Sequence, residues 1–469
     1  MTPTTRLPPP VVLDTTLRDL YSLQADGELR IFLVSVVPSA EVQLKCCMPL
    51  GTRYIYQSPL SGPENTNFLG RIHLQVVAQH YAFVAGKMAV CLIDIDVHDA
   101  SPCPSPGASS FLPPGREEIR RVFSRLDPDQ QPDVRFVPDP AKLDCPEGFV
   151  AAIASPMDCF AHLAPLVDAD AHYDLQSKRA LAISGIPTPS TEVIDTKLQP
   201  SQAGNAKLVA AEVGRMVGCV ESRQPPFVLK MQQSLGSQGT IVVRSSKDRE
   251  HALDVLRAEL GRVLPLLDET NQHLRTSTVL VQDTVAGDAV ALSIFVTPDG
   301  PPVFISCCRQ LLDARDQWIG GYIAYADQDR LRQEYADISE DVARYSRLKG
   351  YRGPLGVDVM TDVEGGRRVA IDVNPRVSGT TPLGVLRGHF SDRRGLHHAA
   401  VLCPLFLSCT RDEFEGTFRE EYHAGSLIIT GWSYDARQAY STAAVIMAAE
   451  TEEKLRNLTD RVNAFKLDW

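Results

Sequence analysis

Apolar and polar residues alternate most regularly within the stretch 356–388, and the alternation predicts two antiparallel strands. Apolar residues occupy every second position at 357–359 and again at 369–373, on either side of a turn-forming Glu-Gly-Gly segment at 364–366. Successive side chains of a strand point to opposite faces, so the residues between the apolar ones share the other face of this hairpin.

The polar face of this predicted hairpin carries candidate metal ligands. Asp358, Asp372 and Asn374 all occupy alternating positions, and on paired strands they can converge. Two carboxylates and an amide oxygen are hard ligands that suit Mg²⁺ bound together with nucleotide phosphates. Arg376, two residues beyond Asn374, adds a planar cation on the same side. A surface hairpin with an acidic outer face would show the same pattern, so upstream segments must decide between the two interpretations.

The first 165 residues or so show the pattern of an α/β unit. Segments 30–37 and 89–95 are predicted strands, and segment 68–85 is a predicted helix. The Pro/Ser/Gly-rich segment 100–115 is predicted to be a loop. No glycine fingerprint follows either strand, so no dinucleotide site is predicted here.

Helix and strand patterns become clearer after this unit. Residues 174–184 have helical periodicity, and Gly185 is placed to end that helix. Segment 227–230 is a predicted strand that ends in a lysine, followed by the Gly-containing segment 234–240 and a second strand at 241–244. Glycines at a hairpin tip let backbone N–H groups approach phosphate oxygens, although any flexible hairpin has a similar composition.

Downstream, the patterns predict the order antiparallel sheet, helix, antiparallel sheet, followed by a C-terminal part of mixed structure. Apolar residues in steps of three and four predict a helix at 328–349. A second helix is predicted at 451–465, where Glu452 and Glu453 suit a helix N-terminus. The predicted strands, besides the hairpin above, are 278–285, 291–295, 303–306, 426–429 and 443–447.

Composition narrows the classes of function. The 469 residues are enough for two or three domains. Lys and Arg total 47 against 58 Asp and Glu, a net charge of −11, which disfavours general nucleic-acid or anionic-membrane binding. The 11 cysteines include the pairs Cys46-Cys47 and Cys307-Cys308 but no CxxC spacing, so neither structural zinc nor a disulfide scaffold is expected.

The N-terminus lacks the basic start and apolar stretch of a secretory signal. The longest apolar stretch, 399–409, is too short to cross a membrane and contains Pro404. A cytoplasmic protein is therefore expected.

In their order and spacing, these segments resemble the ATP-grasp superfamily over about 170–390. The resemblance rests on GVDVM with AIDVNPRVSG, on the lysine and GIPTP that open the region, and on the strand lysine followed by a Gly-rich hairpin. It implies an ATP-grasp fold of mixed α/β and α+β class, in which two α+β subdomains clamp ATP between antiparallel sheets. The implied domains are an N-terminal α/β domain at 1–165, an ATP-grasp domain at 166–390 with a small lid subdomain at about 190–280, and a C-terminal segment at 391–469 that completes the ligase domain.

The resemblance also implies roles for single residues. Two lysines would hold the α- and β-phosphates, the hairpin would fold over the phosphates, residues 282–285 would form the adenine hinge, and Asp288 would contact the ribose. The implied metal ligands for two Mg²⁺, which Mn²⁺ could replace, are Asp358, Asp372 and Asn374, and the implied catalytic residues near the γ-phosphate are Arg309 and Arg376. The implied ATP-binding residues are Lys178, Lys230, Ser234, Gly236, Ser237, Gln238, Gly239, Gln282, Asp283, Val285 and Asp288.

Three positions depart from the family pattern. The family commonly has Glu at the positions of Asp372 and Gln282, and its acidic ribose residue often falls one place later, at Ala289. Taken alone, a residue such as Lys178 or Arg309 is most often a solvated surface charge. The segment 317–322 fits either a substrate loop or a packed connection, because its Trp and Tyr could stack on a ligand or on the core.

The activity that the resemblance implies is an ATP-dependent ligase, which joins a small carboxylic acid to an amine or amino acid through an acyl phosphate. Such chemistry needs positioning and charge neutralisation, with no protein nucleophile. The alternatives are an ATP-grasp phosphotransferase and a nucleotide-binding regulatory protein without turnover. The implied partners are small molecules, and a homodimer is one assembly that the resemblance allows.

Overall fold

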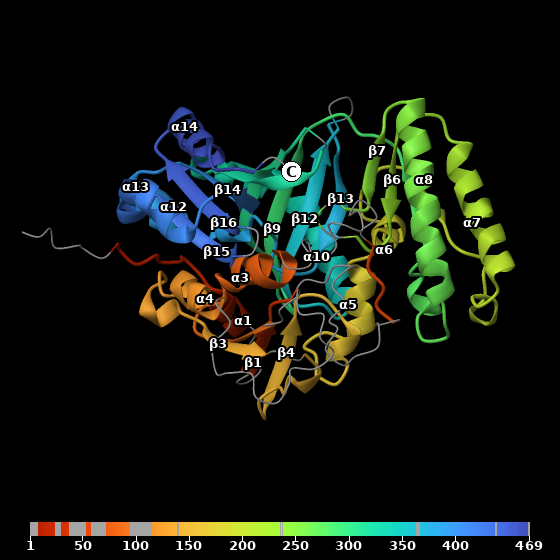
Figure 1. The fold of residues 1–469 in the computed structure, drawn as a ribbon, viewed down its shortest axis with the longest axis horizontal. Helices are drawn as coiled ribbons and strands as arrows, with labels where there is room; N and C mark the ends of the chain where they lie inside the picture. The colour runs from red at the N-terminus through yellow and green to blue at the C-terminus, as the bar shows by residue number, and fades with distance from the viewer. Residues whose placement is uncertain are drawn as a thin grey trace, which may run out of the picture.

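A computed structural model describes most of the chain (Figure 1). The predicted loop up to residue 114, the Cys46-Cys47 pair, Ser237 and the turn residues 364 and 365 lie outside the described residues. The described residues are 8–23, 30–36, 53–57, 72–93, 115–137, 140–234, 236, 238–314, 316–362, 366–436 and 439–467.

The N-terminal part contains a four-stranded parallel sheet, which confirms the predicted α/β unit. Its strand order is β3-β2-β1-β4. The predicted helix at 68–85 begins, within the described residues, as a π-helical segment at Ile72–Val77 and continues as α3. The elements are α1 (Leu17–Ser22), β1 (Arg30–Val34), α3 (Ala78–Ala82), β2 (Ala89–Ile93), α4 (Gly115–Phe123), β3 (Asp133–Val137) and β4 (Phe149–Ile153).

A second sheet of four antiparallel strands has the order β5-β8-β6-β7, and α7 and α8 lie together against it (Figure 1). Apolar side chains of its strands and of the two helices form one buried cluster, which includes Leu229, Val281 and Leu256. This sheet therefore has its own core. Its elements are β5 (Thr191–Ile194), α7 (Ala206–Glu221), β6 (Phe227–Met231), β7 (Thr240–Val243), α8 (Ser246–Val263) and β8 (Val279–Gln282).

The third sheet has eight strands in the order β13-β12-β9-β10-β11-β14-β16-β15. The strands predicted at 291–295 and 303–306, the hairpin after the long helix and the C-terminal strands thus belong to one sheet, whereas the strand predicted at 278–285 is β8 of the second sheet. The strands are β9 (Ala289–Val296), β10 (Val303–Leu312), β11 (Trp318–Ala324), β12 (Gly353–Thr361), β13 (Arg368–Asn374), β14 (His398–Leu407), β15 (Leu427–Asp435) and β16 (Tyr440–Ala449). The remaining helices are α5 (Ala169–Leu175), α6 (Lys178–Ile183), α9 (Gln328–Glu334), α10 (Ala336–Leu348), α11 (Thr381–Gly384), α12 (Arg411–Thr417), α13 (Arg419–Ala424) and α14 (Glu452–Asn463).

Two predicted helices are each divided in the structure. The helix expected at 174–184 is the end of α5 followed by α6, because the Ser177 hydroxyl accepts hydrogen bonds from the first N–H groups of α6 and starts a new helix there. The helix expected at 328–349 is α9 and α10, separated at Tyr335. The apolar period continues through this single non-helical residue, so the sequence pattern did not show the break.

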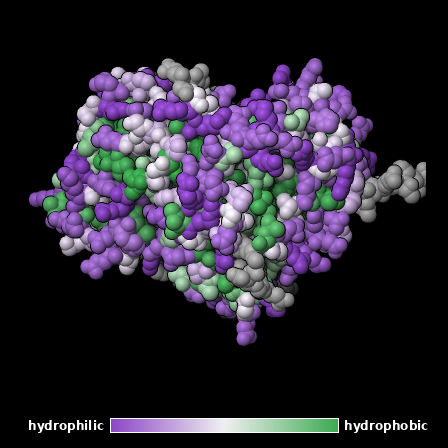
Figure 2. All heavy atoms as spheres, turned by 180° about the vertical axis from the view of Figure 1, so that it is seen from behind, coloured by the Kyte–Doolittle hydropathy of each residue, from purple (hydrophilic) through white to green (hydrophobic). Residues whose placement is uncertain are grey.

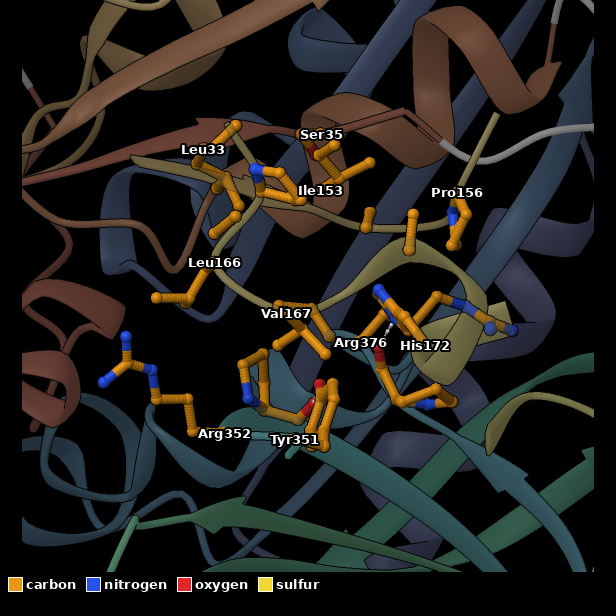
Figure 3. Close-up of a pocket in the computed structure, with 18 of the residues that line it drawn as sticks. Leu33, Ser35, Ile153, Pro156, Leu166, Val167, His172, Tyr351, Arg352 and Arg376 are labelled. Carbon is orange, nitrogen blue, oxygen red and sulfur yellow. Dashed lines mark hydrogen bonds between the residues drawn. The ribbon is translucent and has the colours of Figure 1, made fainter. Parts of the chain in front are cut away.

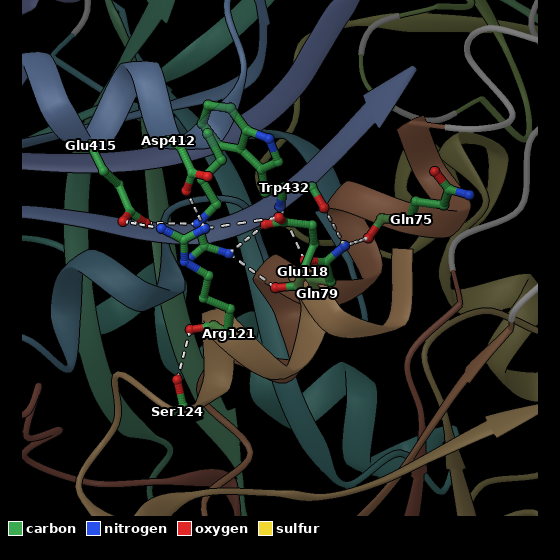
Figure 4. A network of polar contacts seen from close by, with 9 residues as sticks. Gln75, Gln79, Glu118, Arg121, Ser124, Asp412, Glu415 and Trp432 are labelled. Atoms are coloured by element: carbon green, nitrogen blue, oxygen red, sulfur yellow. Dashed lines mark hydrogen bonds and ion pairs between the residues drawn. The ribbon is translucent and has the colours of Figure 1, made fainter. Parts of the chain in front are cut away.

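The N-terminal part packs against the C-terminal strands of the large sheet. Gln79 on α3 exchanges two hydrogen bonds with the backbone of Trp432 on β15, at 3.0 and 3.1 Å. Arg121 on α4 forms an ion pair with Asp412 at 2.6 Å and another with Glu415 (Figure 4). The first and last parts of the chain therefore share one core, in which Trp432 is fully buried.

Seen from behind, hydrophilic residues cover most of the surface and hydrophobic areas are interspersed among them (Figure 2). Among the described residues, no helix combines the length and the apolar character needed to cross a bilayer. The predicted division of the chain at residues 165 and 390 stays a prediction.

Candidate active site

A cleft of about 1570 Å³ lies between the sheet β5-β8-β6-β7 and the eight-stranded sheet. Its walls also include Val77 and Tyr81 from the N-terminal part and Phe406 from β14. The structure brings most of the predicted site residues together here. Those that line the cleft are Lys178, Lys230, Gly236, Gln238, Gln282, Asp283, Val285, Asp288, Arg309, Asp358, Asp372, Asn374 and Arg376.

The two candidate metal-binding carboxylates face each other across neighbouring strands. Asp358 on β12 pairs directly with Asp372 on β13, and Asn374 lies opposite Gly356. The paired valines Val357 and Val373 point into the core on the other face. The two strands therefore pair as the alternation predicted, and their polar side chains lie on the face opposite the core.

The electrostatics of this pair fit a bound cation. Burial, together with the neighbouring Asp372 carboxylate, raises the pKa of Asp358 to about 7. Asp372 Oδ1 is buried without a hydrogen-bond partner among the described residues, although Lys178 Nζ lies 3.3 Å away as an ion pair. A divalent cation between the two carboxylates would relieve their repulsion. No group of three or more His, Cys, Asp and Glu side chains in the described chain forms a metal site, so Asn374 would complete this one.

Both predicted phosphate lysines are buried beside the carboxylates. Lys178, the first residue of α6, donates from Nζ to the backbone oxygen of Ser234 at 2.9 Å. Lys230 on β6 donates from Nζ to the backbone oxygen of Ile371 at 2.8 Å. Two ammonium groups next to two carboxylates form a dense cluster of opposite charges, which suits a ligand that carries both phosphates and a metal ion.

We predict that nucleotide affinity falls as pH rises through about 8. Burial lowers the pKa of Lys230 to about 8, so its ammonium is present below that pH and is lost above it. Losing a charge-assisted hydrogen bond to a phosphate should weaken ATP binding roughly tenfold. Titration calorimetry with ATP from about pH 6.5 to 9.5 measures this, because the range spans the transition.

Lys230→Arg serves as the matched variant, since its guanidinium stays protonated throughout that range. Its affinity should not show the decline near pH 8. A decline of equal size in Lys230→Arg would show that another group causes the pH dependence.

The Gly-containing hairpin follows Lys230 in the chain and forms part of the cleft wall. A side chain at Gly239 would bring its Cβ within 2.5 Å of Ser234 Cβ, so only glycine fits there. Gly236 has a φ of +56°, in the left-handed region that glycine favours. Ser234 itself is buried, and it offers Lys178 its backbone oxygen. Ser234 and Gly239 thus shape the hairpin, while Gly236 and Gln238 line the cleft.

Arg376 is a buried cation at the end of the metal-binding strand. Its side chain is 7 % exposed, its Nη2 donates to Asn374 Oδ1 at 2.6 Å, and its Nε has no hydrogen-bond partner among the described residues. Burial lowers the pKa of His172 to about 4, so the neutral ring donates from Nε2 to the oxygen of Pro375 at 2.8 Å and fixes this segment. Arg376 also lines a small, mostly apolar pocket of about 40 Å³ (Figure 3). Arg376 also interacts with the Tyr81 hydroxyl group, so Nε is the unpaired part of this guanidinium, and a buried cation with a free donor is suited to an anionic ligand.

Comparison with known families explains this arrangement. Residues 175–380 match the model of a family described as the ATP-grasp domain. This part of the chain is an ATP-grasp domain. The match confirms the expected ATP-grasp fold for residues 175–380 and agrees with ATP and Mg²⁺ as the expected cofactors. A search of curated proteins finds no match.

Solved structures with a similar fold include an ADP complex of N5-carboxyaminoimidazole ribonucleotide synthetase, with 13 % identity, a TM-score of 0.46 and coverage of 71 % of this chain and 86 % of that one. The ATP complex of carboxyaminoimidazole ribonucleotide synthase from Aspergillus clavatus has 13 % identity and a TM-score of 0.46, with 93 % and 99 % covered. The biotin carboxylase domain of 2-oxoglutarate carboxylase from Hydrogenobacter thermophilus has 9 % identity and a TM-score of 0.45, with 94 % and 91 % covered. At these TM-scores the family assignment rests on the sequence model.

The predicted adenine hinge, residues 282–285, has two side chains that form contacts within the protein. Gln282 Nε2 donates to Thr191 Oγ1 at 2.9 Å, and Asp283 forms an ion pair with Arg223. These contacts anchor the segment at the end of β8, and its residues 282–285 line the cleft. Asp288 is exposed at the cleft, next to Ala289 at the start of β9. The roles of Asp288 and the hinge in ribose and adenine binding stay predictions.

Arg309 lines the cleft, but its guanidinium is engaged with residues outside the predicted site. Its guanidinium lies over the ring of Tyr322, 4.4 Å from the centroid, and pairs with Glu452 at 3.1 Å. The next residue, Gln310, points to the opposite face of β10, where its Nε2 donates to Asp358 Oδ1 at 2.7 Å. Gln310 was missed because the sequence pattern ended this strand at residue 306, whereas β10 continues to Leu312.

We predict that Gln310→Ala lowers the affinity for Mg²⁺ by roughly tenfold or more, because a partner that orients a metal-binding carboxylate is removed. The dependence of ATP turnover on Mg²⁺ concentration measures this effect. The control is Gln333→Ala on the exposed face of α9, which should behave like the unchanged protein. An unaltered Mg²⁺ dependence in Gln310→Ala would show that Asp358 needs no such support.

Proposed function

We propose that this protein is an ATP-dependent ligase that joins a small carboxylic acid to an amine or amino acid through an acyl phosphate. The observation that supports this most is Arg376, a buried cation with an unpaired Nε beside the carboxylate pair and the two phosphate lysines. An acid that is to attack the γ-phosphate must lie beside the metal site with its charge neutralised, and Arg376 offers that position.

The reaction proceeds in two displacements. An oxygen of the acid attacks the γ-phosphorus and ADP leaves, and the amine nitrogen then displaces phosphate from the acyl carbon to form the amide. Lys178 and Lys230 hold the phosphates in line, and Arg376 holds the acid and afterwards the acyl phosphate. Mg²⁺, held by Asp358, Asp372 and Asn374, would neutralise the charge on the β- and γ-phosphates.

Water must be kept from the acyl phosphate. The hairpin at 234–240 would cover the phosphates, and Gly236 and Gly239 allow its backbone to approach closely. The cysteine that lines the cleft, Cys403, is buried, and burial raises the pKa of its thiol to about 12. It stays a neutral thiol at pH 7, which agrees with a reaction that needs no protein nucleophile.

The test is mass spectrometry of the protein incubated with Mg·ATP and a panel of carboxylic acids and amino acids, with hydroxylamine in a parallel sample. An amide or a hydroxamate formed together with ADP supports the ligase and names its acid. A phosphorylated product that is stable to hydroxylamine would instead support the phosphotransferase. Binding of ATP with no ADP formed from any acid would contradict both reactions and favour the regulatory protein.

A further inference from the structure

We propose that the acid substrate is a monocarboxylic acid with an apolar or aromatic side group, which lies against a wall of apolar residues next to Arg376. This inference rests on the proposed ligase function, because it concerns the acid of that reaction. The members of this apolar wall are Val77, Tyr81, Trp318, Cys403, Pro404 and Phe406, all of which line the cleft.

The first part of the wall comes from the N-terminal part of the chain. Tyr81 lies beside both Arg376 and Cys403, and Arg376 opposes the effect of burial, which raises the pKa of Tyr81. Val77 stands one helical turn before Tyr81, so the two residues share a face. On this side the cleft is therefore lined by Tyr81, whose hydroxyl group interacts with Arg376, and by the aliphatic side chain of Val77.

Trp318, at the start of β11, forms another part of the wall. A Cβ at Gly379 would lie 2.4 Å from Cη2 of Trp318, so the indole packs directly on the backbone three residues beyond Arg376. Burial lowers the pKa of His80 to about 4, and its neutral ring donates from Nε2 to the oxygen of Gly379 at 2.8 Å. The N-terminal part thus fixes the segment on which the indole rests.

The charges of the cleft are distributed unevenly. Its carboxylates belong to the hinge, to the connection between β10 and β11, and to the metal-binding strands. The described cleft residues from the π-helical segment Ile72–Val77, from α3 and from the C-terminal segment include one charged side chain, Lys466. An α-amino acid bound as the acid would place its ammonium beside Arg376, where this wall supplies no carboxylate partner. An apolar group there instead leaves water for a hydrophobic surface.

The nearby hydroxyl groups already bond to one another. Ser378 Oγ lies 3.0 Å from Ser293 Oγ, 3.2 Å from Thr380 Oγ1 and 3.0 Å from Thr381 Oγ1. These contacts satisfy the polar atoms of the segment after Arg376 without a ligand. A ligand in this part of the cleft would therefore gain most from one anionic group, which pairs with Arg376, and from an apolar group, which packs on the wall.

The experiment is titration calorimetry of acetate, butanoate, hexanoate, phenylacetate, succinate and glycine against the full-length protein, saturated with Mg²⁺ and a non-hydrolysable ATP analogue. Affinity should rise about fourfold for each methylene from acetate to hexanoate, as expected for a methylene that becomes buried. Phenylacetate should bind at least about tenfold more tightly than succinate or glycine. ADP release and hydroxamate formation are measured with the same acids, ATP and hydroxylamine.

Trp318→Ala tests the wall itself. It should weaken phenylacetate at least about tenfold and acetate less than about twofold, whereas Trp318→Leu should restore most of the loss. Leu348→Ala, at a residue 81 % exposed at the end of α10, is the control and should change neither affinity.

Three results would overturn the inference. They are binding of succinate or glycine as tight as or tighter than that of phenylacetate, an equal effect of Trp318→Ala on acetate and phenylacetate, and no binding of any acid. Apolar acids that bind in the expected order without ADP or hydroxamate would leave the inference standing and would contradict the ligase reaction. If ADP and hydroxamate form in an acid-dependent way but succinate or glycine is the preferred acid, the ligase reaction would be supported and the inference about an apolar acid would be contradicted. The two proposals therefore fail separately.

Discussion

Asp372→Ala combined with Asn374→Ala is expected to lower turnover of Mg·ATP by about a thousandfold or more, while the protein still folds. The double variant removes two of the three predicted oxygen ligands and would leave Asp358 to hold the metal alone. Each lost electrostatic contact to the transferring phosphate costs about a hundredfold in rate. Both side chains face the cleft, whereas the neighbouring Val373 remains in the core. The register of β12 and β13 depends on backbone hydrogen bonds, which the change leaves intact.

Two measurements test this prediction together. ADP release reports turnover, and the rise in Tm on adding Mg·ATP reports binding of the complex. The double variant should lose ADP release and most of the rise in Tm on adding Mg·ATP. Without ligand, its Tm should be close to that of the unchanged protein. Asp254→Ala, whose exposed side chain lies on α8, is the control for removing a carboxylate. Turnover that survives in the double variant would mean that the metal is held elsewhere.

Arg376→Ala is expected to lower kcat/KM for the acid by about a hundredfold to a thousandfold and to change the affinity for ATP by less than about threefold. The guanidinium is the buried cation that would neutralise the acid, whereas Lys178 and Lys230 would hold the nucleotide. Its bond to Asn374 also orients a predicted metal ligand, so a modest effect on Mg²⁺ dependence is included in the expectation.

Steady-state kinetics with varied acid and calorimetry with ATP separate these two effects. Because Arg376→Ala leaves a cavity, Arg376→Lys is measured beside it: the ammonium keeps the charge but loses the fork of the guanidinium. The kcat/KM of Arg376→Lys for the acid should be about tenfold higher than that of Arg376→Ala. If both variants keep the acid kinetics and lose ATP affinity instead, Arg376 would be a phosphate ligand and the position of the acid would have to change.

Much of the candidate site could be predicted from the sequence, because it lies on a regular strand pair. A period of two residues fixes which side chains share a face, so the alternation alone was enough to place Asp358 and Asp372 together. The lysine at the end of β6 and the glycines after it were found in the same way, from a strand followed by residues that permit close approach.

Other parts of the site depend on contacts between distant segments, which periodicity does not record. Gln310 and Arg309 are neighbours, and only the true end of β10 shows which of them faces Asp358. Likewise, β8 and β9 follow each other closely in the chain but belong to different sheets. The apolar wall joins residues more than 300 positions apart, such as Tyr81 and Cys403, and no local pattern could have assembled it.

The strand order of the large sheet has a consequence for the synthesis of the protein. β14 pairs with β11, and β16 and β15 follow it at the edge, so the sheet is completed only by residues well beyond the end of the matched domain at residue 380. Until these residues have emerged from the ribosome, the backbone N–H and C=O groups at the free edge of β11 have no partner strand. A chain that stops at residue 380 would keep that edge permanently, and we expect it to self-associate rather than fold into a functional domain.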